Sequence, residues 1–74
     1  MLAPKTVYII LFFLNNKFCG YSKINDIYWT QYPHCAQFFT DEEEAKRRYL
    51  YLCKVHKDSK ELSFEIGIFN KPEE

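Results

Sequence analysis

Glycine and proline are scarce in this chain of 74 residues, which holds two glycines and three prolines. This scarcity excludes a collagen-like repeat and a low-complexity linker. It also leaves the chain without a glycine-rich loop of the kind that holds phosphate groups. Net charge is absent too, because ten lysines and arginines balance ten aspartates and glutamates. A neutral chain is a poor candidate for gripping a nucleic-acid backbone over its whole surface, or for mimicking DNA.

Cysteine is rare as well, with three residues at Cys19, Cys35 and Cys53. An odd and widely spaced set of this kind does not form a disulfide framework. We therefore expect free thiols in a reducing compartment, where they behave as small hydrophobic side chains.

No hydrophobic run is long enough to cross a membrane as a helix. The longest run, residues 7–14, falls well short of the roughly 18–20 apolar residues that a membrane span needs. No small-x-small cleavage site follows it, as a secretory signal would require. We therefore expect a cytoplasmic protein, with no membrane among its partners.

Aromatic side chains, by contrast, are abundant, with one tryptophan, six tyrosines and seven phenylalanines in the chain. Each ring buries about 150–250 Å² when it is enclosed. A domain of this size buries only about 60% of the surface of its unfolded chain, so it cannot enclose every ring. Some aromatic surface is therefore expected to stay exposed, and such surface usually marks a site for a partner.

The first half of the chain reads as a β-hairpin. Successive side chains of a strand point to opposite faces of the sheet, and residues 6–14 are apolar at both odd and even positions. This predicts a central strand with both faces covered. Asn15 and Asn16 mark a tight turn, because asparagine tolerates positive φ. Residues 17–23 form the returning strand, in which Gly20 predicts a bulge or a close approach of another backbone.

Two further strands are predicted. Residues 27–32 form the third strand, which Pro33 interrupts and residues 36–39 resume. Residues 61–69 alternate between apolar and polar side chains, which predicts a half-buried last strand. Residues 70–74 are expected to form a frayed tail.

A helix is predicted between these two strands. Thr40 is expected to open it in a capping box with Glu43, and it runs to about residue 56 or 57. The acidic residues of its first turn are stabilised by the positive end of the helix dipole. Three pairs at i, i+4 spacing have the favourable orientation: Glu42–Lys46, Glu43–Arg47 and Glu44–Arg48.

These elements predict a single small α+β domain over residues 1–74, in the order β-β-β-α-β. The four-stranded, mainly antiparallel sheet has strand order 4-1-2-3, with one helix packed on one face. The second face of the first strand then needs a cover, which is the N-terminal residues, another molecule such as a second copy, or the rings themselves. The rings expected at this partner-binding surface are Tyr8, Phe12, Tyr28, Trp29 and Tyr32.

Two alternative functions follow from other residues. The outer side of the helix is basic, which is compatible with nucleic-acid binding through Lys46, Arg47, Lys54 and Lys57. Cys53 and His56 have the spacing of half a zinc site, which Cys19 with Cys35 or His34 would complete. The simpler interpretation of these cysteines and histidines is core packing, so we predict no metal and no cofactor.

Catalytic arrangements are missing from the sequence. His34 and Cys35 are neighbours, and neighbouring side chains of a strand point to opposite faces, so they do not form a nucleophile and its base. The acidic residues lie at a solvated helix start or on the last strand, rather than as an inward pair. We therefore predict a protein-binding module that is not an enzyme.

The stretch from Trp29 to Phe69 combines an aromatic strand, the sequence FFTDEEEA at the start of a helix, and a closing strand. Together with its size and element order, this resembles small orphan proteins of bacteriophages and mobile elements. Many of those are host-takeover factors or anti-CRISPR inhibitors. The resemblance implies an inhibitor that acts in the host cytoplasm by steric occlusion of a host protein complex. It implies no particular functional residue.

Overall fold

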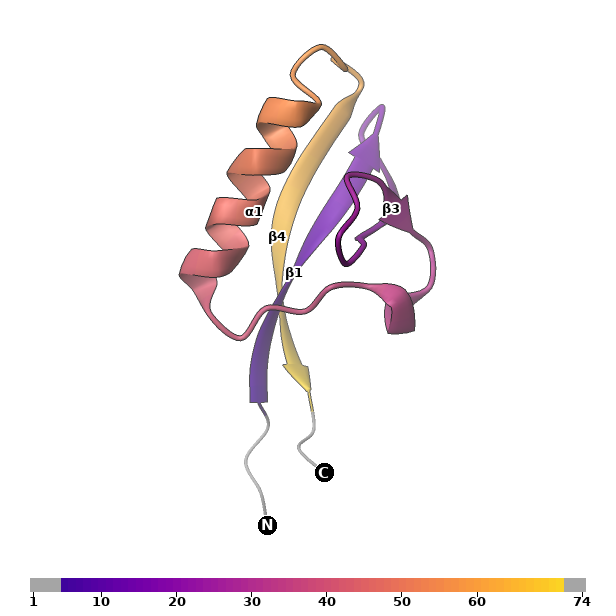
Figure 1. The fold of residues 1–74 in the computed structure, drawn as a ribbon. Helices are drawn as coiled ribbons and strands as arrows, with labels where there is room; N and C mark the ends of the chain where they lie inside the picture. The colour runs from indigo at the N-terminus through magenta and orange to yellow at the C-terminus, as the bar shows by residue number, and fades with distance from the viewer. Residues whose placement is uncertain (1–4, 72–74) are drawn as a thin grey trace.

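The computed structural model describes residues 5–71 and shows one helix on a four-stranded sheet (Figure 1). The strands lie in the order β3-β2-β1-β4, and all neighbouring strands are antiparallel. The predicted α+β class, element order and strand order are confirmed. The elements are β1 (Lys5–Leu14), β2 (Lys17–Ser22), β3 (Trp29–Thr30), the 3₁₀-helix η1 (Pro33–Cys35), α1 (Glu42–Val55) and β4 (Leu62–Lys71).

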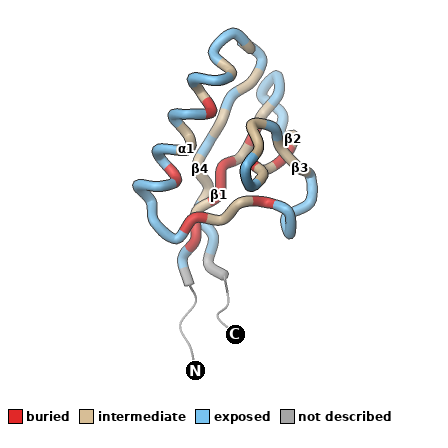
Figure 2. The backbone as a smooth tube through the Cα atoms, viewed as in Figure 1, coloured by how far each residue is buried: buried red, intermediate tan, exposed pale blue. Residues whose placement is uncertain are grey.

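β1 is the central strand, as its two apolar faces predict. It pairs with β4 along its whole length, from Lys5 opposite Lys71 to Leu14 opposite Leu62. Buried residues are concentrated along it (Figure 2). β4 is longer than predicted, because residues 70 and 71 continue the pairing instead of belonging to a tail. The rest of the predicted tail lies outside the described residues.

The hairpin between β1 and β2 has the predicted turn, and its bulge lies at Cys19, one residue before the glycine at which it was predicted. Asn15 and Asn16 have φ values of 52° and 67°, the left-handed conformations that a two-residue hairpin turn needs. The pairing register then shifts between Phe12 and Phe13, so that Cys19 is the extra residue of a bulge. Gly20 lies opposite Phe12, next to this bulge.

β3 is shorter than the predicted strand over residues 27–32 and consists of Trp29–Thr30 only. Nearby side chains accept hydrogen bonds from backbone N–H groups that a longer strand would use to pair with its neighbour. The N–H of Tyr28 donates to Asp26 Oδ1 at 3.0 Å, and the N–H of Tyr32 donates to the threonine hydroxyl of the strand at 3.2 Å. Such local bonds compete with strand pairing, which explains the short strand.

The predicted resumption of this strand at residues 36–39 is also wrong. Pro33, which has no N–H to donate, opens η1 instead. Beyond η1 the chain makes isolated bridges, one of which joins Phe39 to Tyr8 by two hydrogen bonds of 2.7 and 2.8 Å. This segment therefore lies beside β1 and leads across it to the start of α1 (Figure 1).

The helix begins one residue later than predicted. Asp41 is its N-cap, with extended backbone angles and a side chain that accepts the N–H of Glu43 at 3.1 Å. The capping box predicted at Thr40 is therefore wrong, because the aspartate takes the same backbone donor. α1 ends at Val55, and the N–H of His56 closes the last turn on Leu52.

The two neighbouring candidates for the cap give a direct test. Asp41→Ala removes the acceptor for an N–H at the helix start, so we expect it to lower the free energy of unfolding by about 1 kcal/mol. Thr40→Ala is the matched control, and its effect should stay within about 0.5 kcal/mol. Urea unfolding followed by far-UV circular dichroism measures both. A larger loss for Thr40→Ala than for Asp41→Ala would restore the original assignment of the cap.

The core lies between α1 and one face of the sheet. Ile10 and Phe12 of β1 are fully buried there against Ala45 and Leu52 of α1, and Phe39 completes the cluster. The cluster is lined by partly buried side chains from several elements: Tyr8, Cys19, Ile27, Trp29, Tyr49, Phe64 and Ile66.

Candidate functional site

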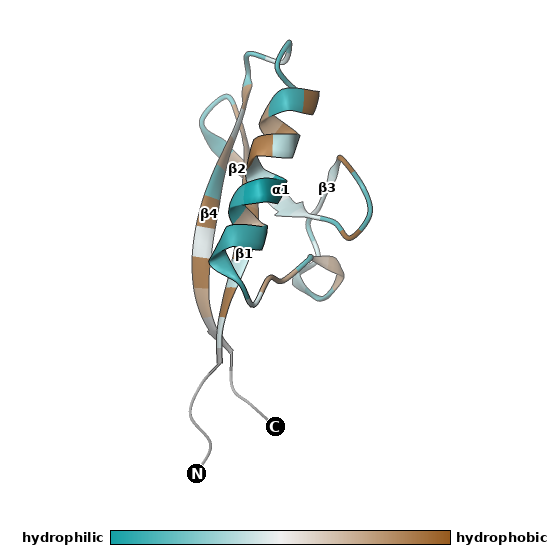
Figure 3. Ribbon diagram, turned by 60° about the vertical axis from the view of Figure 1, so that its left-hand side comes forward, coloured by the Kyte–Doolittle hydropathy of each residue, from teal (hydrophilic) through white to brown (hydrophobic). Residues whose placement is uncertain are grey.

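The second face of the sheet carries no helix among residues 5–71, since α1 lies on the other side (Figure 3). The pairing register and the ring contacts determine which side chains lie on it. We call this surface the uncovered face, and it consists of Val7, Ile9, Leu11 and Phe13 from β1 together with Phe18, Tyr21, Phe38 and Phe69.

The rings of the uncovered face cover much of it themselves. Phe38 and Phe69 are in contact at one end, with centroids 6.1 Å apart. Phe18 contacts Tyr21 at the other end, with centroids 5.2 Å apart. The aliphatic side chain of Ile9 between them is only 1% exposed. One of the three covers expected from the sequence, the rings themselves, is thus present, whereas residues 1–4 lie outside the described part of the chain.

None of the five predicted partner-binding rings lies on the uncovered face, and three of them pack in the core on the helix side. Phe12 is fully buried under α1, and Trp29 packs on it with ring centroids 5.5 Å apart. Tyr8 also packs against the core on the helix side. The prediction that Tyr8 and Phe12 face away from the helix is therefore wrong. Both faces of β1 are apolar, so the strand pattern alone does not indicate which face the helix covers.

Tyr28 and Tyr32 are exposed, at 58% and 64%, as the prediction requires. They belong to the irregular segment on the helix side of the sheet rather than to the uncovered face. Tyr32 packs beside His34 of η1, with ring centroids 5.7 Å apart. Tyr28 lies beside His56 at the end of α1, with ring centroids 6.2 Å apart.

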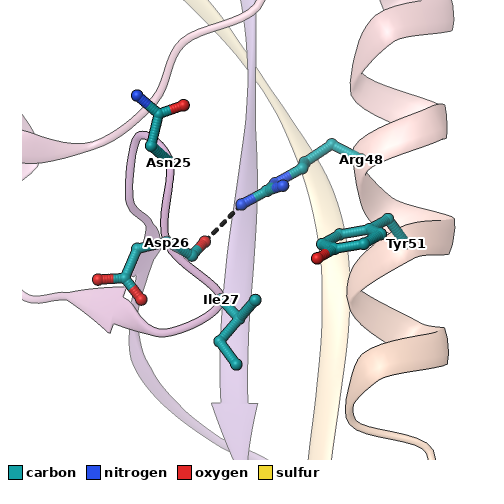
Figure 4. Close-up of a pocket in the computed structure, with 5 residues that line it drawn as sticks. All are labelled: Asn25, Asp26, Ile27, Arg48 and Tyr51. Carbon is teal, nitrogen blue, oxygen red and sulfur yellow. Dashed lines mark hydrogen bonds between the residues drawn. The ribbon is translucent and has the colours of Figure 1, made fainter.

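A cleft of about 500 Å³ opens between α1 and the turn that precedes β3 (Figure 4). Arg48 reaches across it from the helix, and its Nη2 donates to the backbone carbonyl of Asp26. The guanidinium carbon lies 5.0 Å from the centre of the Tyr51 ring, which is a cation–π contact. We call this site the Arg48 cleft; its lining residues are Asn25, Asp26, Ile27, Arg48 and Tyr51.

Local backbone conformation shapes the turn side of the Arg48 cleft. Asn25 has a φ of 57°, a left-handed conformation that asparagine tolerates. Asp26 then accepts the N–H of Tyr28, and its other carboxylate oxygen lies 3.6 Å from Lys23 Nζ. The backbone hydrogen bond, followed by the positive charge of Lys23, lowers the pKa of Asp26 below its usual value. This carboxylate therefore stays ionised at neutral pH.

The charge of Arg48 has no acidic partner within residues 5–71. The predicted ion pair with Glu44 does not form, and the carboxylate of Asp26 points away from the guanidinium (Figure 4). In addition, Nε of Arg48 is buried without a hydrogen-bond partner. The site thus presents a positive charge that only a backbone carbonyl and a ring stabilise.

Exposed side chains adjoin the lining of the Arg48 cleft along the helix and along the chain. Tyr51 is 47% exposed and Val55, one helical turn later, is 40% exposed. Tyr28, which lies beside His56 at the end of α1, is 58% exposed. We use the term rim for Tyr28, Tyr51 and Val55.

The basic residues of the second hypothesis lie on the outer side and at the end of α1, where all are exposed. Part of their charge is paired within the helix. Lys46 Nζ lies 3.1 Å from Glu42 Oε1. The hydrogen bond to Glu42 and the negative charge of that residue raise the pKa of Lys46. Nucleic-acid binding stays a prediction for Lys46, Arg47, Lys54 and Lys57.

The cysteines and histidines do not assemble into a metal site. Within residues 5–71 there is no group of three or more His, Cys, Asp or Glu side chains placed to hold a metal ion. His56 instead forms a hydrogen bond of 2.7 Å with the carbonyl of Ile27. The Cys19 thiol, whose pKa is raised by burial, donates to the carbonyl of Phe12 at 3.3 Å. The zinc hypothesis therefore finds no support in this part of the chain.

Sequence reasoning missed the Arg48 cleft, because it assigned Arg48 to an ion pair within the helix. The available signal was the turn at Asn25 and Asp26, which is 22 residues away from Arg48 in the sequence. Placing Arg48 next to this turn would have required predicting which side of α1 faces the turn.

Comparison with known proteins adds no relationship: no protein family matches the chain, and no curated protein or solved structure is significantly similar to it. Among residues 5–71 there is also no helix with the length and apolar character needed to cross a membrane.

Proposed function

We propose that this protein is a non-enzymatic binding module that docks onto another protein through the Arg48 cleft and its rim, and so blocks that part of the partner's surface. The observation that carries the proposal is a guanidinium without an acidic partner in residues 5–71, in contact with the exposed ring of Tyr51. Exposed Tyr28 follows the lining residue Ile27 in the chain, and exposed Val55 lies one helical turn after Tyr51. Tyrosine and arginine are enriched in protein interfaces and among the residues that dominate their affinity.

The geometry of the cleft supports binding rather than catalysis. Its lining includes no cysteine, serine or histidine that could serve as a nucleophile or as its base. The resemblance to small proteins of bacteriophages and mobile elements implies a host complex as the partner, and this part of the proposal stays a prediction.

The proposal is tested by comparing variants for binding to one purified partner. Immobilised protein is exposed to a bacterial lysate, captured proteins are identified by mass spectrometry, and the affinity of each purified candidate is then measured. Since a central interface ring contributes about 2 kcal/mol or more, we expect Tyr28→Ala with Tyr51→Ala to weaken binding by at least about 100-fold.

Two controls locate the contact. Tyr32→Ala removes an equally exposed ring that does not line the cleft, so it should leave the affinity unchanged. Phe69→Ala removes an exposed ring of the uncovered face. If Phe69→Ala abolishes binding and the double tyrosine variant does not, the contact belongs to the uncovered face and the proposal is wrong.

A further inference from the structure

Arg48 is held in place without being neutralised. Its Nη2 donates to the carbonyl of Asp26, and Tyr51 stacks beside its guanidinium. The guanidinium is a cation, and neither of these contacts supplies a negative charge. A charge that is partly removed from water and lacks a counter-ion is unfavourable, and an entering anion relieves that cost.

The acidic groups of the chain that are nearest in sequence or space do not supply this counter-ion. Glu44 lies one helical turn before Arg48, but the two form no ion pair. The carboxylate of Asp26 is occupied by the N–H of Tyr28 and by Lys23, and it points away from the cleft (Figure 4). Since Nη2 is engaged and Nε is buried, Nη1 is the guanidinium nitrogen that remains available to an external acceptor, and a carboxylate oxygen forms a charge-assisted hydrogen bond with it.

We infer that the Arg48 cleft binds a carboxylate of the partner protein, carried by an acidic residue that has an aromatic or apolar neighbour. The inference rests on the proposed function and names the chemistry of the partner. The neighbour would lie against Ile27 and Tyr51, and a volume of about 500 Å³ is large enough for both groups.

The charges around the cleft favour a carboxylate over a phosphate group. Arg48 is the only cation among the lining residues, and Asp26 adds a negative charge to the same lining. Lys23, the nearest other cation that the turn provides, is already paired with Asp26. One unpaired positive charge balances a singly charged carboxylate, whereas a doubly charged phosphate would be left partly uncompensated beside Asp26.

A small probe tests this inference on the intact protein. 3-Phenylpropionate carries a carboxylate and a ring, and 3-phenylpropanamide is its uncharged twin. Each is titrated into ¹⁵N-labelled protein while the Arg48 Nε–H signal is followed by NMR, with inorganic phosphate as a third probe. We expect a saturable shift with the carboxylate and at least about tenfold weaker binding of the amide, because a charge-assisted bond is lost.

Variants assign the effect to one side chain. Arg48→Gln should weaken binding of 3-phenylpropionate at least about tenfold, whereas Arg47→Gln, at an exposed position outside the cleft, should not change it. If Arg48→Gln does not fold, the comparison of acid and amide at the wild-type Arg48 signal decides alone. Equal binding of acid and amide, tighter binding of phosphate, or an equal loss in Arg47→Gln would each overturn the inference.

The partner assay separates this inference from the proposed function. A partner that the double tyrosine variant loses but that Arg48→Gln retains at full affinity would leave the docking surface standing and refute the carboxylate. Loss of the partner in both variants, with tight binding of the acid probe, supports both.

Discussion

Replacing Phe12 by alanine is expected to lower the free energy of unfolding by about 3–5 kcal/mol. Phe12 is 0% exposed, and its ring lies 4.8 Å from the Phe64 ring and 5.5 Å from the Trp29 ring, centroid to centroid. His56 closes a third side of it, with ring centroids 6.2 Å apart. Removing the phenyl ring would leave a cavity that β1, β4 and α1 cannot all close at once, because each is held by its own hydrogen bonds.

The expected loss is a large share of the total free energy of unfolding of this domain. Small domains are stable by about 5–15 kcal/mol, and one of 74 residues belongs at the low end of that range. We therefore expect Phe12→Ala to be close to unfolded at 25 °C. Urea unfolding measures this directly, followed by far-UV circular dichroism and by the fluorescence of Trp29, the single tryptophan of the chain.

Phe18→Ala is the matched control for Phe12→Ala. Phe18 is 51% exposed on the uncovered face and keeps ring contacts only with neighbours on the same face. We expect it to cost about 1 kcal/mol. If Phe12→Ala were as stable as Phe18→Ala, Phe12 would not be the centre of the core, and its original assignment to an exposed partner site would have to be reconsidered.

Gly20→Ala is expected to lower the free energy of unfolding by about 1–3 kcal/mol, although it adds a single methyl group. A Cβ at this position would lie 2.6 Å from the carbonyl oxygen of Thr30 and 2.6 Å from Trp29 Cδ1. The first of these atoms belongs to the backbone, so β3 as a whole would have to move away from β2. Because Trp29 also packs on Phe12, the displacement would reach the core.

The other glycine of the chain provides the control for this close approach. A Cβ on Gly67 would meet Ile9 Cγ2 and Leu11 Cδ1 at 3.4 Å, which is an ordinary contact distance on the uncovered face. Glycine within a strand is less stable than alanine by about 0.5–1 kcal/mol, so Gly67→Ala should be neutral or stabilising. The same urea titration compares the two. Equal stability of Gly20→Ala and the wild type would contradict the close approach of β3.

The positions of Phe12 and Gly20 show how far local patterns predict this fold. The period-2 pattern of β4 and the apolar run of β1 were sufficient to predict both strands. They did not predict that Phe12 lies under the helix, because either parity of β1 would provide an apolar face. The register decides this, since it places Phe12 opposite Phe64 on the single apolar face of β4.

The candidate site was less predictable than the fold. The exposure of Tyr28 was predicted, but on the second face of the sheet, whereas the structure places this ring beside His56 at the end of α1. The role of Arg48 was not predicted, because i, i+4 spacing favoured Glu44 as its partner, whereas the structure joins it to the carbonyl of Asp26 in a distant turn. Helical spacing describes neighbours on one element, and it contains no information about the element that packs beside it.

The sequence by itself determined the four strands and the helix, the asparagine turn and the close approach at Gly20, and the rule for chain connections gave the order of the strands. The elements, the turn and the glycine depend on conformational preferences or periodicities that operate over a few residues. The tertiary structure alone decided which face of β1 is covered, how short β3 is, and that Arg48 lies across a cleft beside exposed tyrosines. These features depend on the register of β1 with β4 and on contacts between residues far apart in the chain, and such contacts are selected by the packing of the whole domain.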